Sequence, residues 1–255
     1  MDVKRNSKKN KKKKIIIAIA IYYVVAILVI FVILQVKKSS RDNKNNENVN
    51  LQEKLSGYVE ETISEDNNKK EFKVDFKSLK AINSDTVGII KVGGTNIEYA
   101  VVKGNDNSYY MNHNFEKESN ETGWIFADYS NIFNHTDYNL VIYGYNTESD
   151  NMFGPLDDIL KKEWDTNGED KYITLITDET TGKYKVFSAY KEISKDNPKI
   201  DFKDDAEYLN YLDEIKSKSV KDFNTVPNGS SGIITLVAYD NDGSNKIIVH
   251  AVRVL

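Results

Sequence analysis

An uncharged apolar run over residues 15–36 limits the possible folds of this chain more than any other feature. These 22 residues would form a helix about 33 Å long, and the hydrocarbon core of a bilayer is about 30 Å thick. A cleaved signal peptide has a shorter apolar core followed by small residues, whereas this run is followed by Lys37 and Lys38. A buried core helix would not follow four consecutive lysines. The sequence therefore predicts a single transmembrane anchor.

Basic residues are concentrated on the N-terminal side of this run. Residues 1–14 contain eight Lys or Arg side chains and one acid, whereas Lys37, Lys38 and Arg41 follow the run. Because the more positive flank of a transmembrane helix stays in the cytoplasm, we expect a cytoplasmic basic tip and an extracellular C-terminal domain at the cell membrane. Outside the tip, 27 basic side chains face 38 acidic ones. This balance argues against nucleic acid as a partner.

The part that follows the anchor divides by composition. Residues 37–48 are polar and show no apolar period, which predicts a flexible stalk. From Val49 to Ile63 apolar side chains recur at helical spacing, so we expect an N-terminal amphipathic helix and a linker over 49–71. Residues 72–255 then form the main domain.

The main domain is rich in short runs of Ile, Val, Tyr and Thr, which predict strands. The eight predicted strands cover 87–92, 95–102, 122–127, 139–145, 171–177, 183–193, 231–239 and 246–253. Gly93 and Gly94 predict a tight hairpin between the first two.

Two amphipathic stretches interrupt these strands. One covers 152–164, and the other covers about 204–218, with Asp204 or Asp205 as its cap and Leu209 among the residues expected to point inward. Eight short strands with two peripheral helices favour a mainly β protein, a closed or nearly closed barrel, over a parallel α/β sheet.

The chain contains no cysteine. This excludes disulfides, thiolate metal sites and a cysteine nucleophile. Its three histidines are His113, His135 and His250, and isolated histidines in such positions are typically structural. Asp240 begins an acidic turn that lacks the later ligands and closing glutamate of a calcium loop, so we expect no metal site.

Four sequence blocks, in order, resemble the signatures of the class B sortases. They are DTVGIIKVGGTNIEYAVVKGNDNSYYMNHNF (85–115), GWIFADYSN (123–131), NLVIYGYNTESDNMFGPL (139–156) and IITLVAYD (233–240). The resemblance covers about 49–255 and implies an eight-stranded sortase-like barrel preceded by an anchor and an extracellular helix.

The resemblance also implies an activity. Sortases are membrane-anchored cysteine transpeptidases of Gram-positive bacteria that cleave a sorting signal on a secreted protein and join it to the cell wall or to a pilin. They need no cofactor, so none is expected here.

The three catalytic positions that the resemblance implies carry other residues. The family's His follows Tyr-Gly, where this chain has Tyr145. Its Cys ends the TLxTC motif, which reads TLVAY here and ends in Tyr239. Its Arg begins the last strand, where Lys246 aligns. A phenol has a pKa of about 10 and is protonated at neutral pH, so loss of nucleophile and acid together predicts little catalysis.

We expect Tyr145 and Tyr239 to lie face to face at the floor of a groove, with Lys246 beside them. The residues expected to flank this groove are Val237, Ala238 and Asp240.

Three hypotheses follow for the function. The first is a pseudo-sortase that binds a sorting-signal peptide, a pilin or surface protein, or an active sortase. The second is a transpeptidase or hydrolase with an atypical nucleophile, either Tyr239 or a hydroxyl of the Ser230–Ser231 pair, with Asp240 or a histidine as base. The third is a passive structural protein of the envelope, with the groove filled by tyrosine side chains.

Overall fold

The computed structural model describes residues 2–63, 70–133, 137–147, 151–165, 171–194, 196–240 and 245–254. The chain divides into two compact units, Met1–Asn43 and Lys44–Leu255, which we describe separately. Helix α1, Asp2–Ser56, contributes to both. Within the described residues, one helix is long and apolar enough to cross a membrane, and it includes most of the predicted anchor.

The C-terminal part of α1 differs from the prediction. Residues 37–48, expected as a flexible stalk, are helical. Within the second unit, Asn48 is buried and its Nδ2 donates to Thr122 Oγ1 at 3.0 Å and to the Gly123 carbonyl at 2.9 Å. For residues 44–48, which belong to the second unit, contacts with a loop of the barrel satisfy a buried amide and outweigh a composition typical of a linker.

The amphipathic helix predicted from the apolar spacing between Val49 and Ile63 ends earlier than expected. Helix α1 stops at Ser56, and the chain turns at Gly57. Strand β1 (Val59–Ile63) then pairs antiparallel with β2 (Lys70–Val74) in a small two-stranded sheet. Three of the five residues in VEETI are β-branched, which suits a strand, although the apolar spacing that continues from Val49 predicts a helix.

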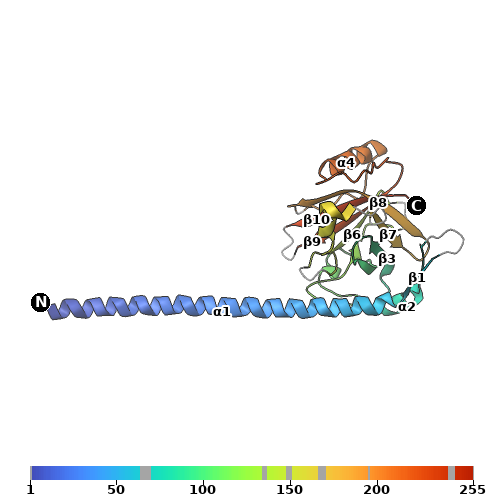
Figure 1. Ribbon diagram of the computed structural model, residues 1–255. Helices are drawn as coiled ribbons and strands as arrows, with labels where there is room; N and C mark the ends of the chain where they lie inside the picture. The colour runs from blue at the N-terminus through green and yellow to red at the C-terminus, as the bar shows by residue number, and fades with distance from the viewer. Residues whose placement is uncertain are drawn as a thin grey trace. The chain divides into compact units, whose positions relative to one another are not determined.

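The remaining strands of the described part close into a barrel of eight (Figure 1). They are β3 (Thr86–Val92), β4 (Glu98–Val102), β5 (Phe126–Ala127), β6 (Asn139–Tyr145), β7 (Tyr172–Ile176), β8 (Thr181–Glu192), β9 (Ile233–Tyr239) and β10 (Lys246–Arg253). Their order around the barrel is β10-β8-β7-β3-β4-β5-β6-β9. The predicted eight-stranded barrel is confirmed, although β4 and β5 are shorter than expected.

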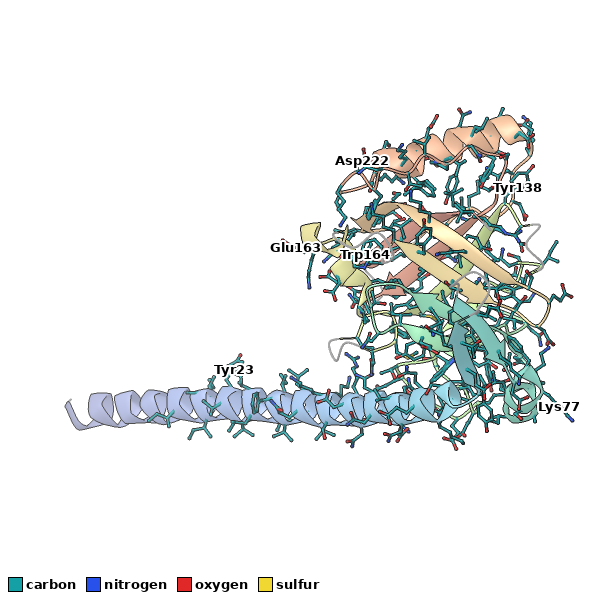
Figure 2. The ribbon with its side chains drawn as sticks, turned by 45° about the vertical axis from the view of Figure 1, so that its right-hand side comes forward. Tyr23, Lys77, Tyr138, Glu163, Trp164 and Asp222 are labelled. Atoms are coloured by element: carbon teal, nitrogen blue, oxygen red, sulfur yellow. The ribbon has the colours of Figure 1, made fainter. Side chains whose placement is uncertain are left out.

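Short helices surround the barrel. They are α2 (Phe76–Ile82), the 3-10 helix η1 (Tyr109–Met111), α3 (Leu156–Ile159), the 3-10 helix η2 (Lys162–Asp165) and α4 (Asp205–Ser217). The single helix predicted over 152–164 is therefore two short pieces, since Pro155 precedes the first turn and the chain tightens to 3-10 geometry at the second. Figure 2 shows Trp164 at this corner, where its ring meets Phe223 at a centroid distance of 6.0 Å.

Helix α4 covers the outer face of β8, β9 and β10. Its N-cap is Asp204, one of the two predicted candidates, and it accepts a hydrogen bond from the Glu207 amide. Tyr208, Leu212 and Ile215 of this helix are buried against the sheet and recur at helical spacing. Leu209 was expected inward but is 44% exposed, because it lies one residue beyond that stripe. Figure 2 shows Tyr138 beneath this helix, with its ring 4.8 Å from that of Tyr208.

The barrel interior is filled by alternate residues of each strand. On β9 these are Ile234, Leu236 and Ala238, and on β10 they include Ile247 and Val249. All are buried in one continuous apolar core. The residues between them, Tyr239 and Lys246 among them, therefore point to the outer face, since side chains alternate along a strand.

Candidate functional site

The three residues that the sequence resemblance matches to the family's catalytic positions lie side by side at the ends of neighbouring strands. Tyr145 of β6 pairs with Tyr239 of the parallel strand β9, and Tyr239 pairs with Lys246 of the antiparallel strand β10. Residues paired in register point to the same face of a sheet. The structure therefore brings Tyr145, Tyr239 and Lys246 together on the outer face.

The Tyr239 side chain is partly buried, and both its hydroxyl and its ring contact neighbouring side chains. Its hydroxyl donates to Asn197 Oδ1 at 2.9 Å, and its ring stacks on Tyr143 at 5.9 Å between centroids. Burial raises the pKa of Tyr239 to about 12, and the nearby charge of Asp128 and the Tyr145 phenol add to the effect. At neutral pH this residue is therefore a neutral hydrogen-bond donor.

Lys246 is a buried cation, with only 2% of its surface exposed. Its Nζ donates to the Asp196 carbonyl at 2.6 Å and lies 5.3 Å from the centroid of the Tyr239 ring. Burial lowers the pKa of Lys246, while the charges of Glu192 and Asp196 oppose the shift. The ammonium is stabilised by a carbonyl dipole and an aromatic face.

The expected flanking residues behave differently from one another. Val237 is buried on the same face as Tyr239, whereas Ala238 points to the barrel interior and pairs with Ile247, so its side chain does not flank the groove. Asp240 accepts from the Asn245 amide at 3.2 Å and from its Nδ2 at 2.6 Å. Its carboxylate is therefore hydrogen-bonded to the residue that precedes β10.

The two described histidines have structural partners. His250 is buried, with Nδ1 2.8 Å from Thr235 Oγ1 and Nε2 3.2 Å from the Tyr190 hydroxyl. Burial lowers the pKa of His250 to about 3, with Lys218 adding to the effect. His113 stacks on Tyr109 at 4.0 Å between ring centroids. His135 lies outside the described residues.

Two residues that touch this site were not predicted. Asp196 and Asn197 belong to the connection between β8 and α4, and they receive the hydrogen bonds of Lys246 and Tyr239. Their separations from these partners, 50 and 42 residues, leave no local signal in the sequence.

A cavity of about 280 Å³ lies between this connection, helix α4 and strands β8 and β10. Its lining includes Tyr190, Glu192, Asp196, Tyr211, Glu214 and Lys218. The ammonium of Lys218 lies 3.3 Å from the Glu192 carboxylate and 3.0 Å from that of Glu214. The charges at this wall therefore pair with one another.

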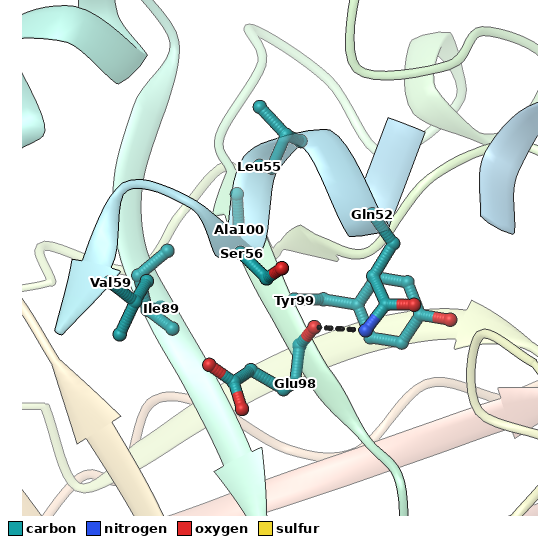
Figure 3. A pocket seen from close by; sticks show the side chains of 8 residues that line it. All are labelled: Gln52, Leu55, Ser56, Val59, Ile89, Glu98, Tyr99 and Ala100. Carbon is teal, nitrogen blue, oxygen red and sulfur yellow. Dashed lines mark hydrogen bonds between the residues drawn. The ribbon is translucent and has the colours of Figure 1, made fainter. Parts of the chain in front are cut away.

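A second hollow, shown in Figure 3, lies between the end of α1 and strands β3 and β4. Gln52 Nε2 donates across it to the Glu98 carbonyl at 3.2 Å. Its free volume is about 10 Å³, room for one water at most. It is a packing seam between helix and sheet.

Known sortases are similar to this chain in sequence and in fold. Sortase B of Staphylococcus aureus (strain NCTC 8325 / PS 47) is 40% identical over 148 residues, which are 57% of this chain and 59% of that protein. The X-ray structure of Clostridium perfringens sortase B is 36% identical, covers 71% of this chain and all of that one, and superposes with a TM-score of 0.66. The chain belongs to the class B sortase family.

A sortase B–substrate complex from Staphylococcus aureus is also similar, with 34% identity, a TM-score of 0.65, and coverage of 70% of this chain and 84% of that one. No family model matches the chain. The sortase resemblance drawn from the motifs is thereby confirmed, together with the barrel. That Tyr145, Tyr239 and Lys246 occupy the positions of the family's His, Cys and Arg stays a prediction from the motif blocks.

Proposed function

We propose that this protein is a non-catalytic class B sortase that binds a sorting-signal peptide of a secreted protein in the groove at Tyr145, Tyr239 and Lys246. One observation carries the proposal. The three side chains that the motif blocks match to the family's catalytic positions lie on one face of adjacent strands, and none of them is a thiol, an imidazole or a guanidinium.

The groups present favour binding over acyl transfer. A transpeptidase needs a nucleophile that ionises near neutral pH and an acid that protonates the leaving amine. The pKa of Tyr239 is raised to about 12, and its hydroxyl donates to an amide oxygen rather than to a base. Phenol and ammonium donors suit a peptide carbonyl or carboxylate as ligand.

The serine alternative is poorly supported by geometry. Ser231 precedes β9, while Tyr239 ends it, so the two are about 26 Å apart along an extended chain. The Ser231 carbonyl accepts from the Tyr208 hydroxyl at 2.9 Å, under α4. Asp240, one of the bases considered for this alternative, accepts a hydrogen bond from the Asn245 side chain. A hydrolase at Ser230 or Ser231 would therefore lie away from the family's groove.

The proposed setting is the outer face of a cell membrane. The apolar N-terminal helix supports a single anchor, and the basic residues that precede it support a cytoplasmic N-terminus. A sorting-signal peptide, presented on a protein that has crossed the membrane, would then reach the barrel on the extracellular side.

The experiment is a titration of the full-length protein in lipid nanodiscs with a fluorescent sorting-signal peptide. Anisotropy reports binding, and mass spectrometry of the same samples reports cleavage or a covalent adduct. We expect saturable binding with an intact peptide, weakened at least tenfold when Tyr145, Tyr239 and Lys246 are all alanine. Tyr129→Ala, at a tyrosine that is 53% exposed, is the matched control.

Three results would contradict the proposal. Cleavage abolished by Tyr239→Phe would show tyrosine chemistry in place of simple binding. Binding unaffected by the triple substitution would place the ligand elsewhere, and no binding of any sorting-signal peptide would leave the structural hypothesis.

A further inference from the structure

The connection between β8 and α4 crosses the outer face of the barrel at the replaced positions. Within it, residues 196–199 are attached at two points. The Tyr239 hydroxyl donates to Asn197 Oδ1 at 2.9 Å, and Lys246 Nζ donates to the Asp196 carbonyl at 2.6 Å. Both donors are residues that replace members of the family's catalytic trio.

A third attachment holds the other end of these four residues. Asn139 Nδ2, at the start of β6, donates to the Lys199 carbonyl at 2.8 Å. The Lys199 ammonium also pairs with Glu207 in the first turn of α4. The four residues are thus fixed to the barrel by β6, β9 and β10, and to α4 by an ion pair.

The attachment at Tyr239 depends on the length of its side chain. The phenol oxygen lies a full aromatic ring beyond Cβ, whereas a cysteine sulfur is bonded to Cβ itself. A thiol on the same backbone would end well short of Asn197. The substitution that removes the nucleophile therefore also creates a contact that the thiol could not make.

We propose that Tyr239 and Lys246 hold residues 196–199 as a clasp across the groove, and that a peptide enters when the clasp opens. The clasp is the direct inference. The gating of peptide entry rests on the proposed function, because it assumes that the groove binds a peptide. Each attachment is one hydrogen bond, and breaking one should raise the population of the open clasp about 3- to 10-fold.

The absence of native cysteines allows a clean test. A nitroxide is attached to Asp196→Cys in the full-length protein in nanodiscs, which leaves intact the backbone carbonyl that Lys246 uses. The mobile fraction of its spectrum is compared in Asn197→Ala, in Asn197→Ala/Lys246→Met and in the control Asn228→Ala, an exposed loop asparagine.

We expect Asn197→Ala to increase the mobile fraction about threefold or more, and the double variant to increase it further. A mobile fraction in the double variant equal to that of the control would overturn the clasp. Thermal unfolding of each variant checks that the barrel is intact.

Association of the sorting-signal peptide with unlabelled Asn197→Ala tests the gate, because this variant keeps all three groove side chains. We expect association 3- to 10-fold faster than in the native protein. Greater label mobility with unchanged association would overturn the gate and keep the clasp. Greater mobility when no variant binds peptide would support the clasp and reject the proposed function.

Discussion

On the outer face of the paired strands β9 and β10, the polar side chains near one end of the pair are covered differently from those near the other end. Toward the end beneath α4, Thr235 and His250 pair in register and are fully buried. At the other end Tyr239 and Lys246 pair in register beneath residues 196–199. The polar groups of one end are enclosed by a helix, and those of the other are covered by four residues of a connection.

The enclosed end forms a chain of hydrogen bonds with assigned directions. Thr235 Oγ1 donates to Asn139 Oδ1 at 2.7 Å, so its single hydrogen is used. His250 therefore donates to Thr235 from Nδ1 and accepts from the Tyr190 hydroxyl at Nε2. A neutral imidazole satisfies every partner in this arrangement, which agrees with the lowered pKa of His250.

The polar groups at the two ends therefore differ in the kind of partner that they have. At the enclosed end every group finds its partner inside the fold. At the other end the partners of Tyr239 and Lys246 belong to residues 196–199, which we propose a ligand displaces at a cost of one or two hydrogen bonds. Four experiments test this difference, from the largest expected effect to the smallest.

The largest effect is expected from restoring the family's trio in the variant Tyr145→His, Tyr239→Cys, Lys246→Arg. We expect a sorting-signal peptide to be cleaved with an increase of 10³-fold or more over the native chain, because the three groups act as a unit. Detection of a thioester by mass spectrometry checks the result. Tyr239→Cys alone is the control and should be nearly inactive. No acylation in a folded triple variant would mean that the groove no longer binds the peptide productively.

Next in size is His250→Ala at the enclosed end. It leaves a cavity and removes the partners of Thr235 and Tyr190, so we expect about 3–4 kcal/mol of destabilisation. Chemical denaturation monitored by circular dichroism measures it. His113→Ala, at a histidine that is only partly buried, should change stability by less than about 1 kcal/mol. Equal effects of the two would show that burial of the network adds no stability.

The pH dependence of unfolding tests the same end. The pKa of His250 in the folded state is about 3, below its unfolded value of 6.5. Its contribution is therefore complete above pH 6.5 and is lost as pH falls toward 3, at up to about 1.4 kcal/mol per pH unit. We expect His250→Gln to flatten this part of the stability curve. A slope unchanged by the substitution would assign the acid sensitivity to carboxylates.

The smallest effect is expected at the other end, from Tyr239→Phe. It removes one hydrogen bond to an exposed acceptor and keeps the ring stacked on Tyr143, so the loss should be about 0.5–1 kcal/mol. Denaturation with Tyr129→Phe as control measures it. A loss above about 2 kcal/mol would show that the phenol is a structural element like His250.

The barrel could be predicted because its signals are local. Runs of apolar and β-branched residues predict each strand. The motif blocks predict which residues, Tyr145, Tyr239 and Lys246, match the family's catalytic positions, without any knowledge of their contacts. The sequence also narrowed the cap of α4 to Asp204 or Asp205, since an N-cap accepts a hydrogen bond from an amide only a few residues away. These features depend on residues close together in the chain.

Composition misled where distant contacts decide conformation. Residues 37–48 have the composition of a stalk, yet they are helical, and Asn48 is bonded to Thr122, 74 residues away. Val59–Ile63 looks like the end of a helix, yet it pairs with β2. In both cases a partner elsewhere in the chain outweighs the intrinsic preference.

The sequence by itself determined the apolar helix, the barrel strands and the lack of a cysteine, and its motif blocks predicted which three residues occupy the catalytic positions. Only the tertiary structure decided that Tyr239 and Lys246 bond to Asn197 and Asp196, and that His250 is enclosed between Thr235 and Tyr190. The reason is physical: these partners are separated by 15 to 60 residues, and only closure of the barrel brings them within hydrogen-bond distance.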